Sequence, residues 1–498
     1  MTTRSIKKSN QHFQKAIHQL PLGVTSNFRY WGDEETIYIE DIAKHVGKEI
    51  LLKGWINIRR DHGKLIFLDL RDATGRVQAV VLPNHEEAGK IASQVRPEWI
   101  IEVKGIVNER PEKMVKEGEL NGTVEIEATE ITVLSEAQTP PFELSEDTSE
   151  INEETRLKYR HLDLRTDRMQ RNMKVRNQFI QHCRNYLLHN KFTEIETPLL
   201  TESTPEGSRD FVVPARLHPG KFYALPQSPQ QYKQLLMVAG FERYFQLARC
   251  IRDEDLRADR GFEHTQIDIE MSFVNQNELL DVIEEMITRS VEEMGYIIKE
   301  KPFPRITYKE AMETYGEDKF DMRTEEEKEK GILAYAWVVD FPFFEKTNDG
   351  KWTFSHNPFS MPKEEHIDDL LAGKNIENIM TQQYDLVCNG FESGGGSIRS
   401  HRPDILKAVY KVMGFSEEET QERIGHMLDA FKYGVPPHGG IALGVERNIM
   451  NLTGESYLRE VQAFPMTRGG QTSVMKAPKE LTPEQLAELH LRVDNEKE

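Results

Sequence analysis

The segment Arg249-Cys-Ile-Arg252-Asp-Glu254-Asp-Leu-Arg257-Ala-Asp-Arg260 ends one predicted strand and opens a charged loop, and Thr265-Gln-Ile-Asp-Ile-Glu270 forms a second strand. Alternation along the second strand places Gln266, Asp268 and Glu270 on one face. A surface ion network is the ordinary explanation for four arginines beside four acids. However, arginine forks also bind phosphates, and a neighbouring acid can accept from an exocyclic amine. The pattern therefore suits a nucleoside triphosphate.

Three further segments resemble parts of a ligand site. The first is Gln227-Ser-Pro-Gln230-Gln-Tyr-Lys233. Gln230 and Lys233 are three residues apart at a predicted helix start, so they share one face of the helix. The three consecutive glycines before Arg399 allow close backbone approach, although a flexible loop is the ordinary explanation. The third segment is a glycine-rich strand that leads into a helix at Gly444-Val-Glu-Arg447. Neither G-x-G-x-x-G after a strand nor a P-loop occurs, so ATP would be held in another way.

The N-terminal part contains short β-rich segments separated by turn residues. The expected strands are 50–58, 65–69, 77–82, 99–107 and 123–133, with turns such as Asn121-Gly122 between them. Five strands in this length suggest a small closed barrel, for which an oligonucleotide-binding barrel is one candidate. An unrelated barrel would give the same pattern. The linker Thr139-Pro-Pro141 follows, and then a basic helix from Arg165 to Asn190.

The net charge of −19 argues against a chain that simply coats nucleic acid. Two local basic clusters are candidate RNA surfaces, Arg59 with Arg60 and Lys64, and the stretch 156–176, although a solvated face is the ordinary explanation for each. The three cysteines lie far apart and form neither a zinc pattern nor a disulfide framework. The polar N-terminus and the absence of a long apolar run predict a cytoplasmic protein without a membrane span.

Phe192-Thr-Glu-Ile-Glu-Thr-Pro198 resembles motif 1 of the class II aminoacyl-tRNA synthetases, Arg252-Asp-Glu254 resembles motif 2, and Gly444-Val-Glu-Arg447 resembles motif 3. The class I signatures HIGH and KMSKS are absent. The chain resembles specifically the bacterial-type aspartyl-tRNA synthetases, over roughly residues 37–495.

The resemblance implies an α+β fold, with an N-terminal five-stranded oligonucleotide-binding β-barrel and a class II core of six antiparallel strands flanked by helices. The implied divisions are an unassigned extension (1–36), the anticodon-binding barrel (37–138), a hinge (139–160), the catalytic domain (161–480) and a tail (481–498). A short link at 324–330 replaces an insertion that bacterial members usually carry. The resemblance also implies a homodimer, with Pro198 near the interface.

The implied activity is that of an aspartate–tRNA ligase using ATP and Mg²⁺. Arg252 and Arg447 match the catalytic arginines, and Glu254 matches the residue that recognises the adenine amine. The full set implied for ATP is Arg252, Asp253, Glu254, His264, Glu392, Gly444, Val445, Glu446 and Arg447. Asp385 and Glu392 match the carboxylates that hold magnesium. Two departures from the family are His264 and Gly261, which stand where relatives have phenylalanine and glutamine.

The implied amino-acid pocket has two fixed cations, Lys233 and Arg399, which suit the aspartate side chain. The other matching residues are Glu206, Gln230, Arg252, Asp268 and His356. Asparagine is neutral and would leave both cations unpaired, at a cost of a few kcal/mol or more. This pair speaks against the alternatives within the subclass, an asparaginyl- or lysyl-tRNA synthetase. Retention of four residues speaks against a non-catalytic RNA-binding paralogue: Arg252, Glu254, Glu392 and Arg447.

The implied partners are tRNA(Asp) and possibly tRNA(Asn). Phe67 matches an aromatic residue that stacks on an anticodon base, although core packing is the ordinary role of a strand phenylalanine. The other matching anticodon-binding residues are Arg60, Gln78, Arg110 and Glu125. Two discrimination markers conflict: His62 resembles members that charge both tRNAs, whereas Lys113 resembles strict members. A final departure is Asn357, which replaces the second histidine of the family's His-His-Pro-Phe.

Overall fold

The computed structural model describes residues 37–203 and 207–494. The extension 1–36 and Glu206 therefore lie outside the described residues. The described chain forms two compact units, one from residues 37–152 with 161–167 and the other from residues 153–160 with 168–494. In this part of the chain no helix combines the length and apolar character that a membrane crossing requires.

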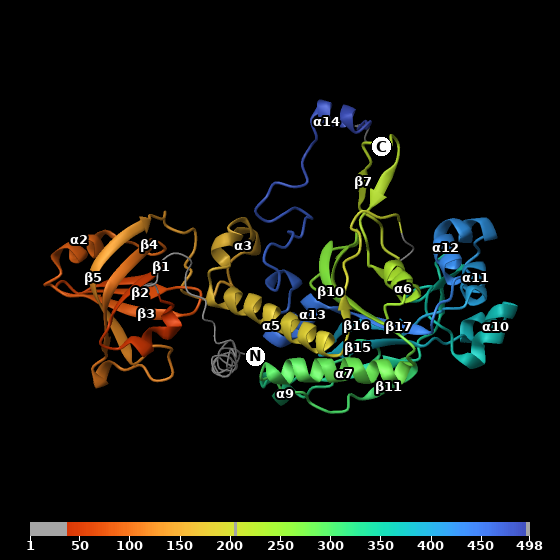
Figure 1. The fold of residues 1–498 in the computed structure, drawn as a ribbon, viewed down its shortest axis with the longest axis horizontal. Helices are drawn as coiled ribbons and strands as arrows, with labels where there is room; N and C mark the ends of the chain where they lie inside the picture. The colour runs from red at the N-terminus through yellow and green to blue at the C-terminus, as the bar shows by residue number, and fades with distance from the viewer. Residues whose placement is uncertain (1–36, 204–206, 495–498) are drawn as a thin grey trace. The chain divides into compact units, whose positions relative to one another are not determined.

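The first unit is a closed five-stranded barrel with the strand order β1-β2-β3-β5-β4 (Figure 1). Its strands are β1 (Glu49–Asp61), β2 (Ile66–Arg71), β3 (Arg76–Val81), β4 (Ile100–Glu109) and β5 (Val124–Ser135), in agreement with the five expected segments. Alternate residues such as Ile66, Leu68 and Leu70 fill the interior together with Ala88 and Ala92 of α2 (Glu86–Gln94). This alternation leaves the residues between them on the outer face.

The second unit is built on an eight-stranded sheet with the order β11-β12-β15-β16-β17-β10-β9-β6. The six strands from β12 to β9 are all antiparallel, as expected, and the short edge strands β11 and β6 add parallel pairs that were not expected. The strand bounds are β6 (Thr193–Glu194), β9 (Arg243–Ile251), β10 (Glu263–Ser272), β11 (Arg305–Thr307), β12 (Tyr335–Val339), β15 (Gln383–Cys388), β16 (Phe391–Ile398) and β17 (His438–Gly444).

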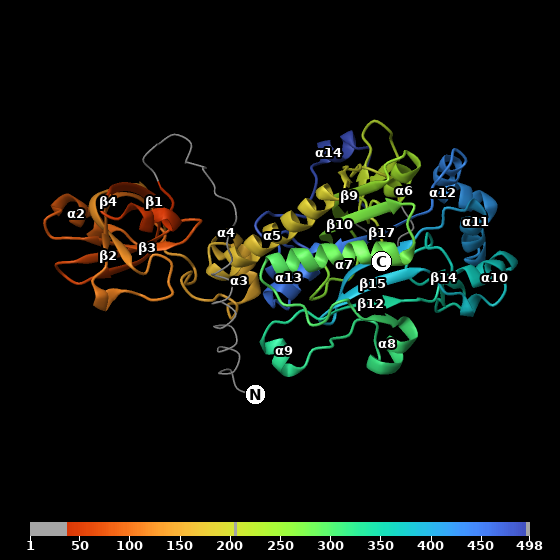
Figure 2. The same cartoon turned by 60° about the horizontal axis from the view of Figure 1, so that its bottom comes forward.

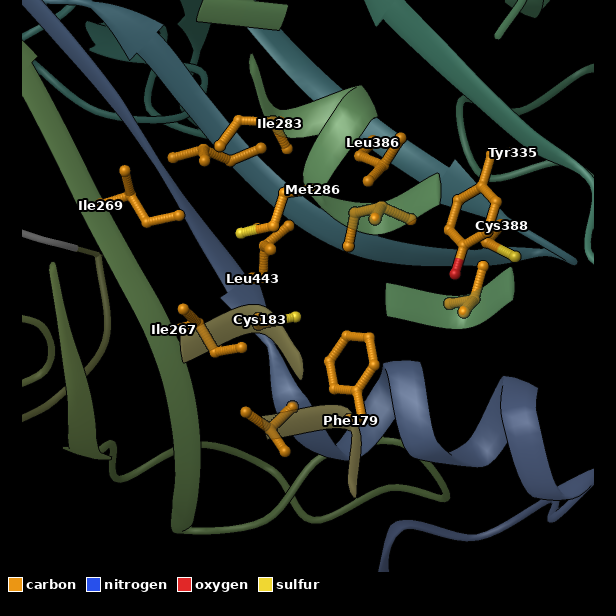
Figure 3. Close-up of a cluster of buried hydrophobic side chains, with 14 of the residues drawn as sticks. Phe179, Cys183, Ile267, Ile269, Ile283, Met286, Tyr335, Leu386, Cys388 and Leu443 are labelled. Atoms are coloured by element: carbon orange, nitrogen blue, oxygen red, sulfur yellow. The ribbon is translucent and has the colours of Figure 1, made fainter. Parts of the chain in front are cut away.

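One face of this sheet packs against three helices, α5 (Asp167–His189), α7 (Gln276–Glu293) and α13 (Val445–Thr453). The contact is apolar: Figure 3 shows Ile267 and Ile269 of β10 beside Phe179 and Cys183 of α5 and Met286 of α7. All three cysteines of the chain are buried, and none of them forms a disulfide bond. The opposite face of the sheet is therefore the one free to carry polar chemistry.

The remaining elements extend this unit. Helices α10 (Ile367–Ala372), α11 (Pro403–Val412) and α12 (Glu417–Phe431) gather beside one another in Figure 2. The link 324–330 forms the single-turn helix α9 (Glu325–Glu329), capped by Thr324. The other elements are α3 (Glu153–Lys158), α4 (Arg160–Asp163), α6 (Gln230–Val238), α8 (Tyr308–Tyr315), α14 (Pro483–Glu488), and the hairpins β7–β8 (Val212–Pro214, Phe222–Ala224) and β13–β14 (Phe344–Lys346, Trp352–Phe354).

The start of the basic stretch 156–176 is not a solvated face. Arg156 and Arg160 are 4% and 0% exposed. Arg156 donates to both carboxylate oxygens of Glu460, at 2.9 and 2.8 Å, and Arg160 donates to the Arg459 carbonyl oxygen. The expectation was wrong here because acids about 300 residues later in the chain neutralise these arginines, and such distant pairing leaves no local pattern.

Candidate active site

A cavity of about 300 Å³ opens on the sheet face opposite α5 and α7. Strand β10 shows how the sequence builds it, since Gln266 and Asp268 line the cavity while Ile267 and Ile269 point into the core. Predicted residues from six distant segments meet there. Those that line the cavity are Gln230, Lys233, Arg252, Glu254, His264, Asp268, His356, Asp385, Glu392, Arg399, Gly444, Glu446 and Arg447.

Two predicted residues do not line the cavity. Val445 is fully buried in the apolar core, and Asp253 lies 3.3 Å from Arg209 Nε while its backbone N–H donates to the Arg209 carbonyl oxygen. Any contribution of these two side chains to ligand binding would therefore be indirect.

One end of the cavity holds a buried network of four charges. Lys233 Nζ lies 2.6 Å from Asp268 Oδ1 and 3.1 Å from Glu270 Oε2. Arg399 Nε donates to Glu270 Oε1 at 3.1 Å, and its Nη1 donates to Ser397 Oγ at 2.9 Å. Glu270 thus bridges the two predicted cations. The two cations and two carboxylates cancel, so this end is neutral before a ligand arrives.

The two carboxyl groups of this network differ. Burial raises the pKa of Asp268, although Lys233 opposes the shift. Burial also disfavours ionised Glu270, but Arg399 and Lys233 together hold the pKa of Glu270 below its usual range. Asp268 Oδ2 is buried and accepts no hydrogen bond of ordinary geometry among the described residues, and the Tyr244 hydroxyl beside it is likewise unsatisfied. Because Asp268 lines the cavity, a ligand with a hydrogen-bond donor, such as an ammonium group, can approach its carboxylate.

Two arginines at the other end of the cavity differ in whether an acidic side chain pairs with them. Arg447 Nη2 lies 3.0 Å from Asp259 Oδ2, and Arg447 Nη1 lies 3.5 Å from Glu392 Oε2. Arg252 donates its Nε–H to the Gln227 carbonyl oxygen at 3.2 Å, and within the described part of the chain it forms no ion pair. Its guanidinium group is consequently the cation most available to an anionic ligand.

His264 lines the same end and carries no charge near neutral pH. Burial, followed by repulsion from Arg252 and Arg447, lowers the pKa of His264 to about 3. A neutral imidazole can stack on a base without adding a charge. Glu446, by contrast, is engaged within the protein: it accepts from the Thr265 backbone N–H at 3.0 Å and lies 3.0 Å from Arg176. Glu446 therefore joins α13 to β10.

Asp385 and Glu392 converge over Gly395. A Cβ atom on Gly395 would lie 3.0 Å from Asp385 Oδ1 and 3.3 Å from Glu392 Oε1, so the glycine leaves room between the two carboxylates. Within the described residues, no three His, Cys, Asp or Glu side chains form a metal cage. Two carboxylates suit Mg²⁺ that is held largely by substrate phosphates. The residues present therefore fit magnesium that binds together with a nucleotide.

The glycine run belongs to a strand and is not a flexible loop. Gly394, Gly395 and Gly396 lie in β16. A Cβ atom on Gly396 would collide with the Gly440 carbonyl oxygen of β17, and one on Gly440 would collide with the Glu270 carboxylate. Only glycine allows these strands and Glu270 to approach so closely.

The roles of two site residues, Glu270 and Gln227, were missed from sequence alone. Glu270 was placed on the site face by alternation, but its bridge to Arg399 was not foreseen. Gln227 is 1% exposed, and its Nε2 donates to Asp210 Oδ1 at 2.6 Å and to the Ser208 carbonyl oxygen at 2.9 Å. Because the Gln227 carbonyl oxygen also accepts from Arg252, this residue fixes the backbone beside the available arginine.

Asn357 organises the turn that follows His356. Its Oδ1 accepts from the Phe359 backbone N–H at 3.0 Å, and its Nδ2 donates to Gln383 Oε1 at 3.2 Å. His356 packs edge-on against Phe341, with ring centroids 4.5 Å apart, and it lines the cavity. The asparagine thus supports the turn, while the single histidine faces the site.

The outer face of the barrel brings together the residues predicted to read bases. Arg60 Nη2 donates to Gln78 Oε1 at 3.1 Å, and Gln78 Nε2 donates to Glu125 Oε2 at 3.0 Å. Arg110 Nε lies 4.0 Å from the same Glu125 oxygen, but Arg110 is buried beneath this face and donates to the Val124 carbonyl oxygen at 2.9 Å. Phe67 is paired with Arg60 across the strands and is half-buried outside the barrel core. Core packing is therefore not its role.

The remaining predicted residues lie at the surface of their own unit. The His62 ring packs edge-on against Phe67, with centroids 5.6 Å apart, so His62 is more than an exposed turn residue. Lys113 is exposed in a 3-10 helix, Glu112–Met114. Pro198 is exposed beside Leu199 and Leu200, whose relative exposures are 53% and 52%.

Comparisons with known proteins add independent findings. A family model described as tRNA synthetases class II (D, K and N) matches residues 152–468, and an OB-fold nucleic acid binding domain matches residues 50–134. The aspartate–tRNA ligase of Staphylococcus saprophyticus is 39% identical over 90% of this chain and 97% of its own length. The aspartate–tRNA(Asp/Asn) ligase of Rubrobacter xylanophilus is also 39% identical, over 90% and 95%.

Solved structures match at the level of the fold. A putative aspartyl-tRNA synthetase from Leishmania major has a TM-score of 0.71 at 22% identity, over 92% of this chain and 96% of its own. The asparaginyl-tRNA synthetase of Pyrococcus horikoshii complexed with asparaginyl-adenylate has a TM-score of 0.69 at 24% identity, over 91% and 100%. The Staphylococcus saprophyticus alignment spans 571 positions, more than this chain contains, so that relative carries residues without a counterpart here.

Proposed function

This chain belongs to the aspartate–tRNA ligases of the class II tRNA synthetase family, and from this premise we infer how its cavity performs the reaction. Such an enzyme uses ATP, L-aspartate and tRNA(Asp). The substrate α-carboxylate attacks the α-phosphorus and pyrophosphate leaves. The 3′-hydroxyl of the tRNA then attacks the aspartyl carbonyl carbon, and AMP leaves. Positioning and charge stabilisation account for most of such transfers, so a protein nucleophile is unnecessary.

We propose that the neutral four-charge network recognises aspartate. The substrate side-chain carboxylate approaches Lys233 and Arg399, while the ammonium group approaches the Asp268 carboxylate, with Gln230 alongside it. Asparagine would bring no charge to the two cations. Both cations already pair with Asp268 and Glu270, so asparagine would not leave them unpaired as the sequence suggested, and the preference for aspartate rests on the added attraction of its carboxylate. This recognition favours aspartate over the asparagine and lysine substrates of the same subclass.

The arginine-lined end is the proposed nucleotide site. Arg252 lacks an ion pair among the described residues, and this observation carries the assignment because the guanidinium group is free to bind the substrate α-carboxylate and the α-phosphate. Arg447 contacts the phosphates, Glu254 accepts from the adenine amine, and His264 stacks on the base as a neutral ring. Asp385 and Glu392 hold Mg²⁺, which would neutralise phosphate charge that otherwise repels the nucleophile.

The outer face of the barrel is the proposed anticodon surface. Phe67 stacks on a base, while Arg60, Gln78 and Glu125 offer hydrogen-bonding groups beside it, and the buried Arg110 supports Glu125. We propose that the enzyme also aspartylates tRNA(Asn). The contact of His62 with the stacking ring supports a role in base recognition, and one relative at 39% identity is an Asp/Asn ligase. Lys113 is the one marker against this proposal, because it resembles the residue of strict members.

A homodimer is proposed from the exposed apolar run that begins at Pro198, because Leu199 and Leu200 are each about half exposed beside the edge strand β6. The cytosol, where tRNA is charged, is the expected location. Sedimentation velocity would test the dimer: a purely monomeric protein at micromolar concentration would contradict it.

Aspartate-dependent exchange of pyrophosphate with ATP tests the reaction directly. Exchange should require magnesium, and Arg252→Ala should lower its rate by about 10²-fold or more because a charge-stabilising group is lost. Arg209→Ala is a matched control, since it removes an exposed arginine that pairs with Asp253 beside the same loop. Near-normal exchange in folded Arg252→Ala would contradict the assigned mechanism.

Charging of purified tRNA(Asn) with labelled aspartate tests the second tRNA. We expect an efficiency within about tenfold of that for tRNA(Asp), equivalent to a difference of about 1.4 kcal/mol. His62→Leu should lower tRNA(Asn) charging more than tRNA(Asp) charging. An efficiency thousands of times lower for tRNA(Asn) in the unmodified enzyme would show strict recognition.

A further inference from the structure

We infer that Lys319 is a resident counter-ion of Glu392, which a divalent cation must displace when it binds with ATP. This inference rests on the proposed metal role of Asp385 and Glu392. Lys319 Nζ lies 2.9 Å from Glu392 Oε2, and the two side chains are 34% and 27% exposed. The ammonium group thus lies against one of the two carboxylates that converge over Gly395.

The fold holds this lysine in place. Lys319 lies in the loop between α8 and α9, where the next residue, Phe320, is 2% exposed and stacks on Tyr315 with centroids 4.2 Å apart. The Phe320 carbonyl oxygen accepts from the Gly390 backbone N–H at 3.0 Å. Gly390 forms the turn between β15, which carries Asp385, and β16, which carries Glu392. The loop is therefore anchored to the same two strands as the carboxylates.

Competition between the two cations follows from this arrangement. Glu392 already has Arg447 at 3.5 Å and Lys319 at 2.9 Å, so its carboxylate is neutralised before any metal arrives. A divalent cation on its own must separate the ammonium group from the carboxylate. A cation that arrives on a triphosphate brings further ligands and a more negative partner for the released lysine. Lys319 would thus make metal binding depend on the nucleotide.

Binding of Mn²⁺ to the full-length enzyme without nucleotide tests this inference. Free Mn²⁺ is measured by electron paramagnetic resonance, so the readout does not depend on catalysis. Lys319→Met, or Lys319→Gln if the first variant does not fold, should bind Mn²⁺ about fivefold more tightly, because a partly exposed ion pair no longer competes. Lys319→Arg keeps the charge and should bind Mn²⁺ as the unmodified enzyme does.

A matched control is available in Lys299, which lies 2.7 Å from Glu327 with side-chain exposures of 26% and 24%. Lys299→Met should leave Mn²⁺ affinity unchanged. Glu392→Gln establishes the site, since it should weaken Mn²⁺ binding. If Glu392→Gln weakens binding but both neutral Lys319 variants leave it unchanged, the role of Lys319 is overturned and the metal site stands. If Glu392→Gln has no effect, the proposed metal site fails together with the inference.

Discussion

Glu270→Gln is the substitution with the most direct consequence for the amino-acid pocket. The change keeps the volume and one acceptor oxygen but removes the charge that Lys233 and Arg399 share, each at 3.1 Å. The network of two cations and two carboxylates would then retain an unbalanced positive charge. The side chain of Glu270 is 0% exposed and those of the cations are 2% and 3% exposed, so water cannot compensate for the loss.

The expected loss of stability is about 3–5 kcal/mol, the usual cost of breaking a buried pair by removing one partner. Urea denaturation followed by circular dichroism would measure it. Asp281→Asn is the control, because Asp281 pairs with Arg305 at 2.7 Å at an exposed site and should contribute at most about 1 kcal/mol. The KM for aspartate should rise by about tenfold or more, because glutamine has one acceptor oxygen and can no longer hold both Lys233 and Arg399 in position. The KM for ATP should stay within about twofold, because Glu270 lies at the amino-acid end.

The pH dependence gives a second test of the same variant. The pKa of Glu270 is lowered in the folded protein, so its contribution to stability is complete above the unfolded carboxyl pKa of about 4.3 and is lost as the pH falls through the lower folded value. The stability difference between the enzyme and Glu270→Gln should therefore shrink in acid. Equal urea midpoints at pH 7, with an unchanged KM for aspartate, would refute the bridging role of Glu270.

Two further predictions concern the nucleotide site and the barrel. The pKa of His264 is lowered to about 3, so the imidazole should stay neutral from about pH 6 to 8. The ratio between the KM for ATP of the enzyme and that of His264→Phe should therefore be constant over this range. A change in the ratio centred near pH 6.5 would show that the imidazole titrates. Phe67→Ala should weaken tRNA charging by about 1–3 kcal/mol, because a stacking contact with a base is lost, and it should leave pyrophosphate exchange intact. An equal fall of both activities in a folded variant would contradict the anticodon assignment.

Local patterns predicted the parts of the site that depend on neighbouring residues. Alternation in residues 266–270 identified the correct face of β10, and the spacing of Gln230 and Lys233 placed both in the cavity. Local patterns do not specify which charges meet across the fold. Arg399 and Glu270 are 129 residues apart, and Arg156 and Glu460 are 304 apart. The bridge and the burial of the basic stretch therefore appeared only in three dimensions.

The family resemblance predicted some of the residues that meet across the fold, but not all of them. Arg252, Glu392 and Arg447 do meet in one cavity, although no pattern in the intervening segments could bring them together. The short edge strands β6 and β11 were not expected, because two or three residues carry too little alternation to be recognised. Lys319 had no motif of its own and was identified only by its distance from Glu392.

The glycines of β16 and β17 limit how variants of this enzyme could evolve a new amino-acid specificity. A single methyl group at position 396 would strike the neighbouring strand, and one at position 440 would strike the Glu270 carboxylate. Positions 396 and 440, in and beside the floor of the cavity, are therefore closed to substitution by a larger residue. A new amino-acid preference would have to arise in side chains that rise from α6 and β10, such as Gln230 and Asp268, while the strands beneath keep the nucleotide chemistry unchanged.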